Sequence, residues 1–195
     1  MEVKVQAIDH RDIFYPPGGI LLWLIIILEL ITFGLGIAGL VYYGRIEPEV
    51  FHQSRLQLNS FIGTVNTMVL LISGYFMANT IVKHKSGDII ATRKYLKWTI
   101  LGGMLFVGLK CYEYVEKLTG NLELEDNMFF TFYWLMTGFH LAHVLVGLVI
   151  LSFSWWHLKT NPSSVQGADL ESGAAFWHMC DLIWLFLFPS LYLIF

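Results

Sequence analysis

Five stretches of the chain are long and apolar enough to cross a membrane as helices. A transmembrane helix needs about 20 consecutive apolar residues, and the candidates are Gly19–Tyr43, Ser60–Val82, Leu96–Val115, Met128–Trp156 and Glu171–Phe195. The third is the weakest by hydropathy, because Lys110 and Glu113 interrupt it three residues apart. The pattern therefore predicts an all-α fold, an integral membrane bundle of five transmembrane helices.

The composition agrees with a membrane protein and narrows the alternatives. The 195 residues are 56% hydrophobic and 14% charged, whereas a soluble domain is about a quarter charged. The connections are short, so we predict a single membrane domain over residues 1–195 that includes an N-terminal tail, residues 1–18. We expect no cleaved signal peptide, because the tail has no apolar core before a small-residue cleavage site. A net charge of -3 and a pI near 6.1 predict no nucleic-acid partner.

The distribution of lysine and arginine predicts the orientation. Cytoplasmic loops carry an excess of these residues. The N-terminal tail and the second and fourth connections carry most of them, and the first and third connections carry few. We therefore expect the N-terminus in the cytoplasm and the C-terminus on the outer, periplasmic side.

Seven ionisable side chains fall at membrane depth, and they are the candidates for chemistry. A charged side chain at the centre of a bilayer costs about 3 kcal/mol on insertion scales, so these groups should face other helices that supply their partners. They are Glu29, Lys110, Glu113, His140, His143, His178 and Asp181.

The histidines admit a metal reading and a structural reading. His140 and His143 are three residues apart, as are His178 and Asp181, and Glu171 lies about two turns before His178. Such pairs on neighbouring helices suit a transition metal, and haem ligation is a further alternative. A diiron bundle, however, draws on about four carboxylates, which this chain lacks. We therefore favour an interhelical hydrogen-bond network in which Asp or Glu fixes each imidazole, with no metal site.

Glu29 and the Lys110–Glu113 pair have their own interpretations. Glu29 lies some nine residues into its helix, about 13 Å at 1.5 Å per residue. It is either a site of proton exchange or partner contact, or a neutral acid that is hydrogen-bonded to a neighbouring helix. Lys110 and Glu113 share one helical face, and we expect them to form an ion pair.

Several motifs occur together in order along the chain. They are the lone Glu29, L-K-C-Y-E-Y-V-E at the end of the third stretch, F-F-T-F-Y-W-L-M-T-G-F-H-L-A-H-V-L-V-G in the fourth, and E-x5-W-H-x2-D followed by L-I-W-L-F in the fifth. Over about residues 20–195 the chain resembles subunit III of the haem–copper cytochrome oxidases. The motifs V-F-H-Q-S-R-L-Q-L-N-S-F-I-G-T-V-N-T, D-N-M-F-F-T-F-Y-W and F-P-S-L-Y-L look closer to one branch, the five-helix subunit III-like accessory protein of bacterial nitric oxide reductases.

The resemblance implies a non-redox accessory subunit of a respiratory haem–copper oxidase in the bacterial inner membrane. Such a subunit packs on catalytic subunit I, next to a subunit II or a cytochrome c-type subunit, and supports proton-coupled oxygen reduction. Haem and copper are then expected in the partners, and this chain is expected to bind no cofactor other than phospholipid.

The same resemblance assigns roles to the membrane-depth residues. Glu29 matches the family's carbodiimide-reactive glutamate, at the contact with the partner or near it. The positions expected to form a structural polar network are Glu113, His140, His143, Glu171, His178 and Asp181.

Longer members of the family have two further helices that hold lipid with the other five, and we expect neither those helices nor their lipid cleft in this chain. Two alternatives to the oxidase reading remain. One is assembly or activation of a nitric oxide reductase. The other is a free-standing membrane metalloenzyme that uses His140, His143, His178 and Asp181.

Overall fold

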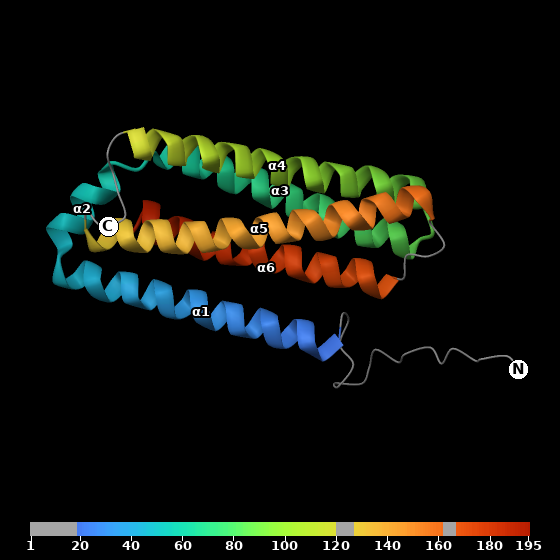
Figure 1. The fold of residues 1–195 in the computed structure, drawn as a ribbon, viewed down its shortest axis with the longest axis horizontal. Coiled ribbons are helices and arrows are strands. Elements are labelled where there is room, and N and C mark those ends of the chain that lie inside the picture. Colours follow the sequence, from blue (N-terminus) through green and yellow to red (C-terminus); the bar gives the residue numbers. More distant parts are fainter. Residues whose placement is uncertain (1–18, 120–126, 162–166) are drawn as a thin grey trace, which may run out of the picture.

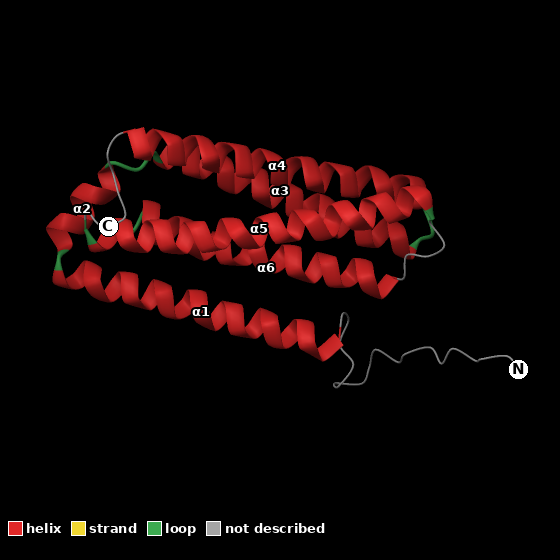
Figure 2. Ribbon diagram, viewed as in Figure 1, coloured by secondary structure: helices red, strands yellow, loops and turns green. Residues whose placement is uncertain are grey.

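The described part of the chain is all-α. The computed structural model describes residues 19–119, 127–161 and 167–195, so the predicted tail, residues 1–18, lies outside it. Figure 2 shows helices joined by short loops and no strand in these ranges. The helices are α1 (Gly19–Ile46), α2 (Pro48–Leu56), α3 (Ser60–Lys85), α4 (Ile89–Thr119), α5 (Met128–Thr160) and α6 (Gly167–Tyr192).

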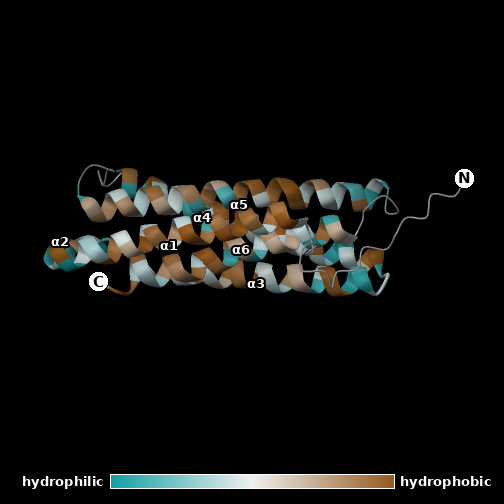
Figure 3. Ribbon diagram, turned by 90° about the horizontal axis from the view of Figure 1, so that it is seen from below, coloured by the Kyte–Doolittle hydropathy of each residue, from teal (hydrophilic) through white to brown (hydrophobic). Residues whose placement is uncertain are grey.

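The five long helices lie alongside one another in a bundle, and α2 sits at one end (Figure 1). The closest pairing is α3 with α4, and α6 packs against α3, α5 and α1. In Figure 3 the hydrophobic residues run along the helices, whereas the hydrophilic ones gather mostly toward the two ends. Helix α1 is the least buried of the four most apolar helices, so much of its surface is left for lipid or for another chain.

The predicted count of five spanning helices is not matched. The described residues form six helices, and four of them, α1, α3, α5 and α6, are long and apolar enough to cross a membrane. Helix α4 is long enough at 31 residues but too polar for the same criterion. Its polarity has a structural reason, because Lys110, Glu113 and Lys117 are all buried in the bundle.

Helix α2 lies between the first two predicted stretches, where the sequence pattern predicts only a connection. It is nine residues long, begins with Pro48 in its first turn and buries Phe51 and Ser54. A stretch this short with mixed polarity gives little periodic signal. Its position is fixed by tertiary contacts, since Arg55 donates from Nε to the backbone oxygen of Tyr192 at 2.9 Å, and Asn127 donates to Ser54 at 2.9 Å.

Trp177 fixes the rotation of α6 in the bundle. Its ring is fully buried and fills a notch between two glycines. A Cβ added at Gly103 of α4 would lie 2.5 Å from the ring, and one at Gly147 of α5 would lie 2.9 Å from it. Small residues let transmembrane helices approach closely. With Trp177 held toward α4 and α5, the Asp181 carboxylate on the next turn of α6 lies against Gly74 of α3.

Candidate functional site

Glu29 of α1 meets His143 of α5. The Glu29 Oε1 and His143 Nε2 atoms are 3.4 Å apart, and the two side chains are 17% and 14% exposed. Aromatic rings surround the imidazole, with the centroids of Phe139 and Phe33 at 4.6 Å and 5.9 Å and that of Phe176 at 6.3 Å. The pair is therefore shielded by rings from three helices.

The hydrogen bonds of His143 define how the pair holds protons. Nδ1 lies 2.8 Å from the backbone oxygen of Phe139, and since a carbonyl only accepts, Nδ1 carries the proton and donates. Nε2 then faces Glu29 with a lone pair, so the contact needs one further proton, held either by the carboxyl or by Nε2. The second oxygen, Glu29 Oε2, is buried and has no hydrogen-bond partner among the described residues. A hydrogen bond between His143 Nε2 and Glu29 Oε1 would therefore use one proton on either atom and would join α1 to α5.

His140 is placed differently from His143. It is fully buried, and its Nε2 lies 3.1 Å from the backbone oxygen of Cys180, to which it donates. The rings of Trp184 and Phe106 pack around it, with centroids at 5.1 Å and 5.7 Å. A backbone carbonyl, and not the carboxylate that the sequence suggested, is the partner of this imidazole, so the two histidines of the T-G-F-H-L-A-H motif face different neighbours.

His178 and Asp181 form a pair within α6. His178 Nδ1 is 3.3 Å from Asp181 Oδ2, and the side chains are 44% and 9% exposed. Glu171 of the predicted network is not part of this pair. That residue instead pairs with Lys85 at 2.9 Å, where α3 ends and α6 begins.

The most enclosed polar group joins α4, α5 and α6. Lys110 Nζ lies 3.1 Å from Glu113 Oε2, and each side chain is 1% exposed, so these residues form the ion pair that their spacing predicts. Lys110 also donates to the hydroxyls of Tyr192 at 2.9 Å and Tyr133 at 3.3 Å. Both hydroxyls donate in turn to Glu113 Oε1. The charges are balanced inside the bundle, as a buried ion pair requires.

The two tyrosines belong to this buried polar group, although the sequence pattern did not single them out. Tyr133 lies in the quoted F-Y-W motif and Tyr192 in the closing S-L-Y-L. The only available signal was that both tyrosines stand in otherwise apolar stretches, where a hydroxyl needs a partner. Their distance from Lys110 along the chain hides the contact, because it depends on how three helices are rotated against one another.

The described residues offer no metal centre. No three His, Cys, Asp or Glu side chains come together there in an arrangement that could hold an ion. The four residues of the metalloenzyme alternative are divided, with His143 at Glu29, His140 at Cys180, and His178 at Asp181. This geometry does not favour that alternative.

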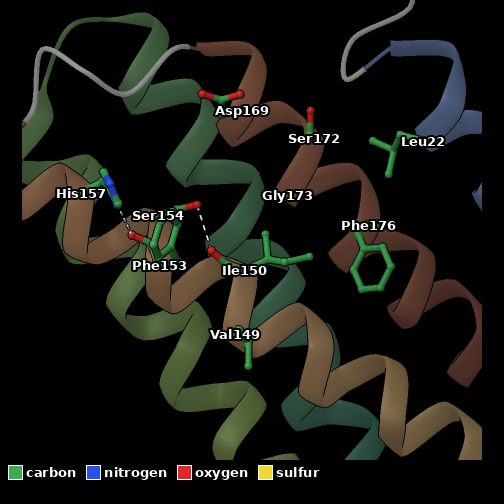
Figure 4. Close-up of a pocket in the computed structure, with 10 residues that line it drawn as sticks. All are labelled: Leu22, Val149, Ile150, Phe153, Ser154, His157, Asp169, Ser172, Gly173 and Phe176. Atoms are coloured by element: carbon green, nitrogen blue, oxygen red, sulfur yellow. Dashed lines mark hydrogen bonds between the residues drawn. The ribbon is translucent and has the colours of Figure 1, made fainter.

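A groove of about 690 Å³ opens between α1, α5 and α6. Figure 4 shows apolar side chains from all three helices, with Asp169 and His157 toward one end. Two of the polar side chains form hydrogen bonds within α5. The Ser154 hydroxyl donates to the backbone oxygen of Ile150 at 3.0 Å, and His157 Nδ1 lies 3.1 Å from the backbone oxygen of Phe153. The groove therefore presents mainly apolar walls with a polar end, a shape that suits an acyl chain.

Comparison with known proteins identifies the family. The model of the family described as cytochrome c oxidase subunit III matches residues 56–194. A cytochrome c oxidase subunit 3 of Thermostichus vulcanus is 30% identical over 96% of this chain and 92% of its own length. The chain belongs to the cytochrome c oxidase subunit III family.

Two further relatives show how the chain compares with other members of the subunit III family. The cytochrome c oxidase subunit 3 of Allomyces macrogynus is 36% identical over 69% of this chain and 49% of its own length. The probable cytochrome c oxidase subunit 3 of Rickettsia conorii is 31% identical over 66% and 46%. This subunit III chain thus spans about half the length of these two relatives. The predicted family is confirmed, whereas the closer resemblance to the nitric oxide reductase branch stays a prediction.

Membership of the subunit III family and the several apolar helices together make the chain a multi-pass membrane protein. The family match begins in α2 and covers α3 to α6, so it includes the histidine pairs and the Lys110 group. Glu29 precedes that match, but the alignment with the Thermostichus relative covers 96% of the chain and therefore includes it.

Proposed function

We propose that this chain is the non-redox accessory subunit III of a respiratory haem–copper oxidase, packed on catalytic subunit I and supporting proton-coupled oxygen reduction. The observation that carries the proposal is the family match over residues 56–194. The geometry supports it, because the buried polar groups are largely used in holding helices together, as expected of a subunit that stabilises another. Haem and copper then belong to the partner chains, next to a subunit II or a cytochrome c-type subunit.

Five membrane crossings are part of the proposal, with α4 as the fifth. Its 31 residues are enough for a span, and its packing along α3 supports a helix that crosses with it. The buried charges of Lys110 and Glu113 are neutralised by each other and by tyrosine hydroxyls. Their desolvation is therefore offset inside the bundle, and they do not exclude α4 from the membrane. The bacterial inner membrane, with the N-terminus in the cytoplasm, is the proposed setting.

The Glu29–His143 pair is the proposed point at which this subunit affects proton traffic. Its support is the 3.4 Å contact between two partly shielded ionisable groups, next to a Glu29 oxygen that has no partner among the described residues. A phospholipid in the groove between α1, α5 and α6 would lie near it, since Phe176 lines the groove and also stacks on His143.

Native purification of the tagged chain from its own membranes in mild detergent tests the proposal. A large multi-helix chain and haem bands in the reduced-minus-oxidised spectrum are expected to accompany it, and the complex should reduce oxygen. A complex that reduces nitric oxide instead would select the alternative partner. A chain that emerges alone and without haem would refute the subunit function.

Glu29→Gln tests the proton role separately. The amide of Gln can donate to His143 Nε2 as a protonated carboxyl would, so the complex should assemble while turnover slows or activity is lost sooner during turnover. Glu116→Gln, an exposed carboxyl on α4, is the matched control. Unchanged rates and lifetimes in the assembled Glu29→Gln complex would rule the role out.

A further inference from the structure

One of the seven ionisable side chains at membrane depth is not enclosed. Glu29 and His143 are 17% and 14% exposed, and Lys110 and Glu113 are each 1% exposed. The His178 side chain is 44% exposed. It lies seven residues beyond Glu171, about 10 Å further along the helix axis. Glu171 and Lys85 mark the polar end of the bundle, so the His178 imidazole opens onto the hydrocarbon region.

The hydrogen bonds of His178 leave one ring nitrogen free to bind outward. Nδ1 is engaged with Asp181 Oδ2 at 3.3 Å. Within the described ranges Nε2 makes no hydrogen bond. Asp181 cannot rotate away from the pair easily, because its carboxylate is wedged against Gly74 of α3. The fold thus holds the imidazole with one nitrogen toward the bundle and the other away from it.

The surface around His178 has the features of a helix-docking face. We define the His178 face as the exposed side of α6 formed by His178, Leu182, Leu185 and Phe186. Next to it, a groove of about 410 Å³ runs between α6 and α1 and is lined by Leu182 and Phe186 together with α1 residues that include Gly34. A Cβ added at Gly34 would meet nothing within 4 Å.

Association of helices in lipid depends on close packing at small residues and on hydrogen bonds between helices. The His178 face offers the hydrogen bond through His178, and the adjoining groove offers the small residue Gly34 of α1. A lipid tail would fill the groove but would leave the imidazole without a partner, which is costly in hydrocarbon. A helix that carries a polar side chain at this depth would satisfy it.

We propose that the His178 face docks a transmembrane helix of the haem-containing catalytic chain, and that this helix presents a hydrogen-bonding side chain to His178 Nε2. The inference rests on the proposed function, which supplies that chain. The His178 face is thus the side of the subunit that makes the contact, and His178 is the side chain that selects the partner.

Photo-cross-linking in native membranes tests the face. A benzophenone amino acid replaces Leu182, which is 41% exposed on α6, and in a matched variant it replaces Leu105, which is 53% exposed on α4. The Leu182 variant keeps His178 and Asp181, so the proposed hydrogen bond can still form at the altered face. It should form a cross-link to the haem-containing chain, and the Leu105 variant should not.

The outcomes separate this inference from the function on which it rests. A haem chain that cross-links from Leu105 and not from Leu182 would overturn the docking face while leaving the subunit function standing. A product between two copies of this chain, or lipid adducts alone at Leu182, would also overturn the docking face. If no haem chain accompanies the unmodified protein, the subunit function itself fails.

A substitution series at His178 tests the hydrogen bond. Interhelical hydrogen bonds in membranes predict a roughly 3- to 15-fold loss of affinity when one is removed, measured as haem recovered per tagged chain over a detergent titration. His178→Leu should show this loss and His178→Gln should retain more of the haem. Equal recovery from wild type and His178→Leu, with both chains folded by circular dichroism, would refute the contact.

Discussion

Removing Lys110 alone should destabilise the bundle strongly. In Lys110→Met the Glu113 carboxylate keeps the hydroxyls of Tyr133 and Tyr192 but loses the one cation that pairs with it in the described ranges, and its side chain is 1% exposed. Breaking a buried ion pair from one side typically costs about 3–5 kcal/mol. Glu113→Gln should cost a similar amount, because it leaves the ammonium of Lys110 without a counter-charge.

The double variant Lys110→Met/Glu113→Gln separates charge from packing. Both charges are gone, and the Gln oxygen can still accept from the two tyrosines. The expected cost is that of the lost hydrogen bonds, about 1–3 kcal/mol. The double variant should therefore be more stable than either single one, a non-additivity expected only of residues in one network.

Unfolding of the purified chain in detergent micelles by titration with SDS, followed by circular dichroism, measures these free energies. Lys97→Met is the matched control, because Lys97 is an exposed lysine on the same helix, and it should stay within about 0.5 kcal/mol of wild type. Single variants as stable as this control, or a double variant that loses the sum of the two single costs, would refute the account of a buried, charge-balanced network.

Two further predictions concern packing around α6. Gly74→Ala should cost about 1–3 kcal/mol because its methyl group would overlap the Asp181 carboxylate, whereas Gly108→Ala, which meets nothing within 4 Å, should cost nothing measurable in the same SDS titration. Trp184→Phe removes the bond from Nε1 to the Thr67 hydroxyl at 2.9 Å and should cost about 1 kcal/mol for that bond plus a packing loss. Adding Thr67→Val should then remove little more, and full additivity would show that the bond does not matter.

The positions of the apolar stretches could be predicted from sequence because hydrophobicity is a local property. Each of the five predicted stretches lies largely within one long helix, although the helices extend further, as α4 does from Ile89 to Thr119. The spacing of Lys110 and Glu113 gave their ion pair, since residues three apart share a helical face. The order of the quoted motifs along the chain predicted the subunit III family. All of these signals reside within a single helix or in the order of the chain.

Only the tertiary structure decided which polar groups meet across helices. His140 and His143 share a spacing that is compatible with one site, yet the rotation of α5 against α6 and α1 gives one a backbone oxygen and the other Glu29. The same kind of register brings Tyr192 to Lys110 across 82 residues. Hydropathy fixes that a helix is in the membrane but not its rotation. The rotation follows from steric fit between helices, such as the fit of Trp177 against Gly103 and Gly147. The sequence of one helix alone does not specify such a fit.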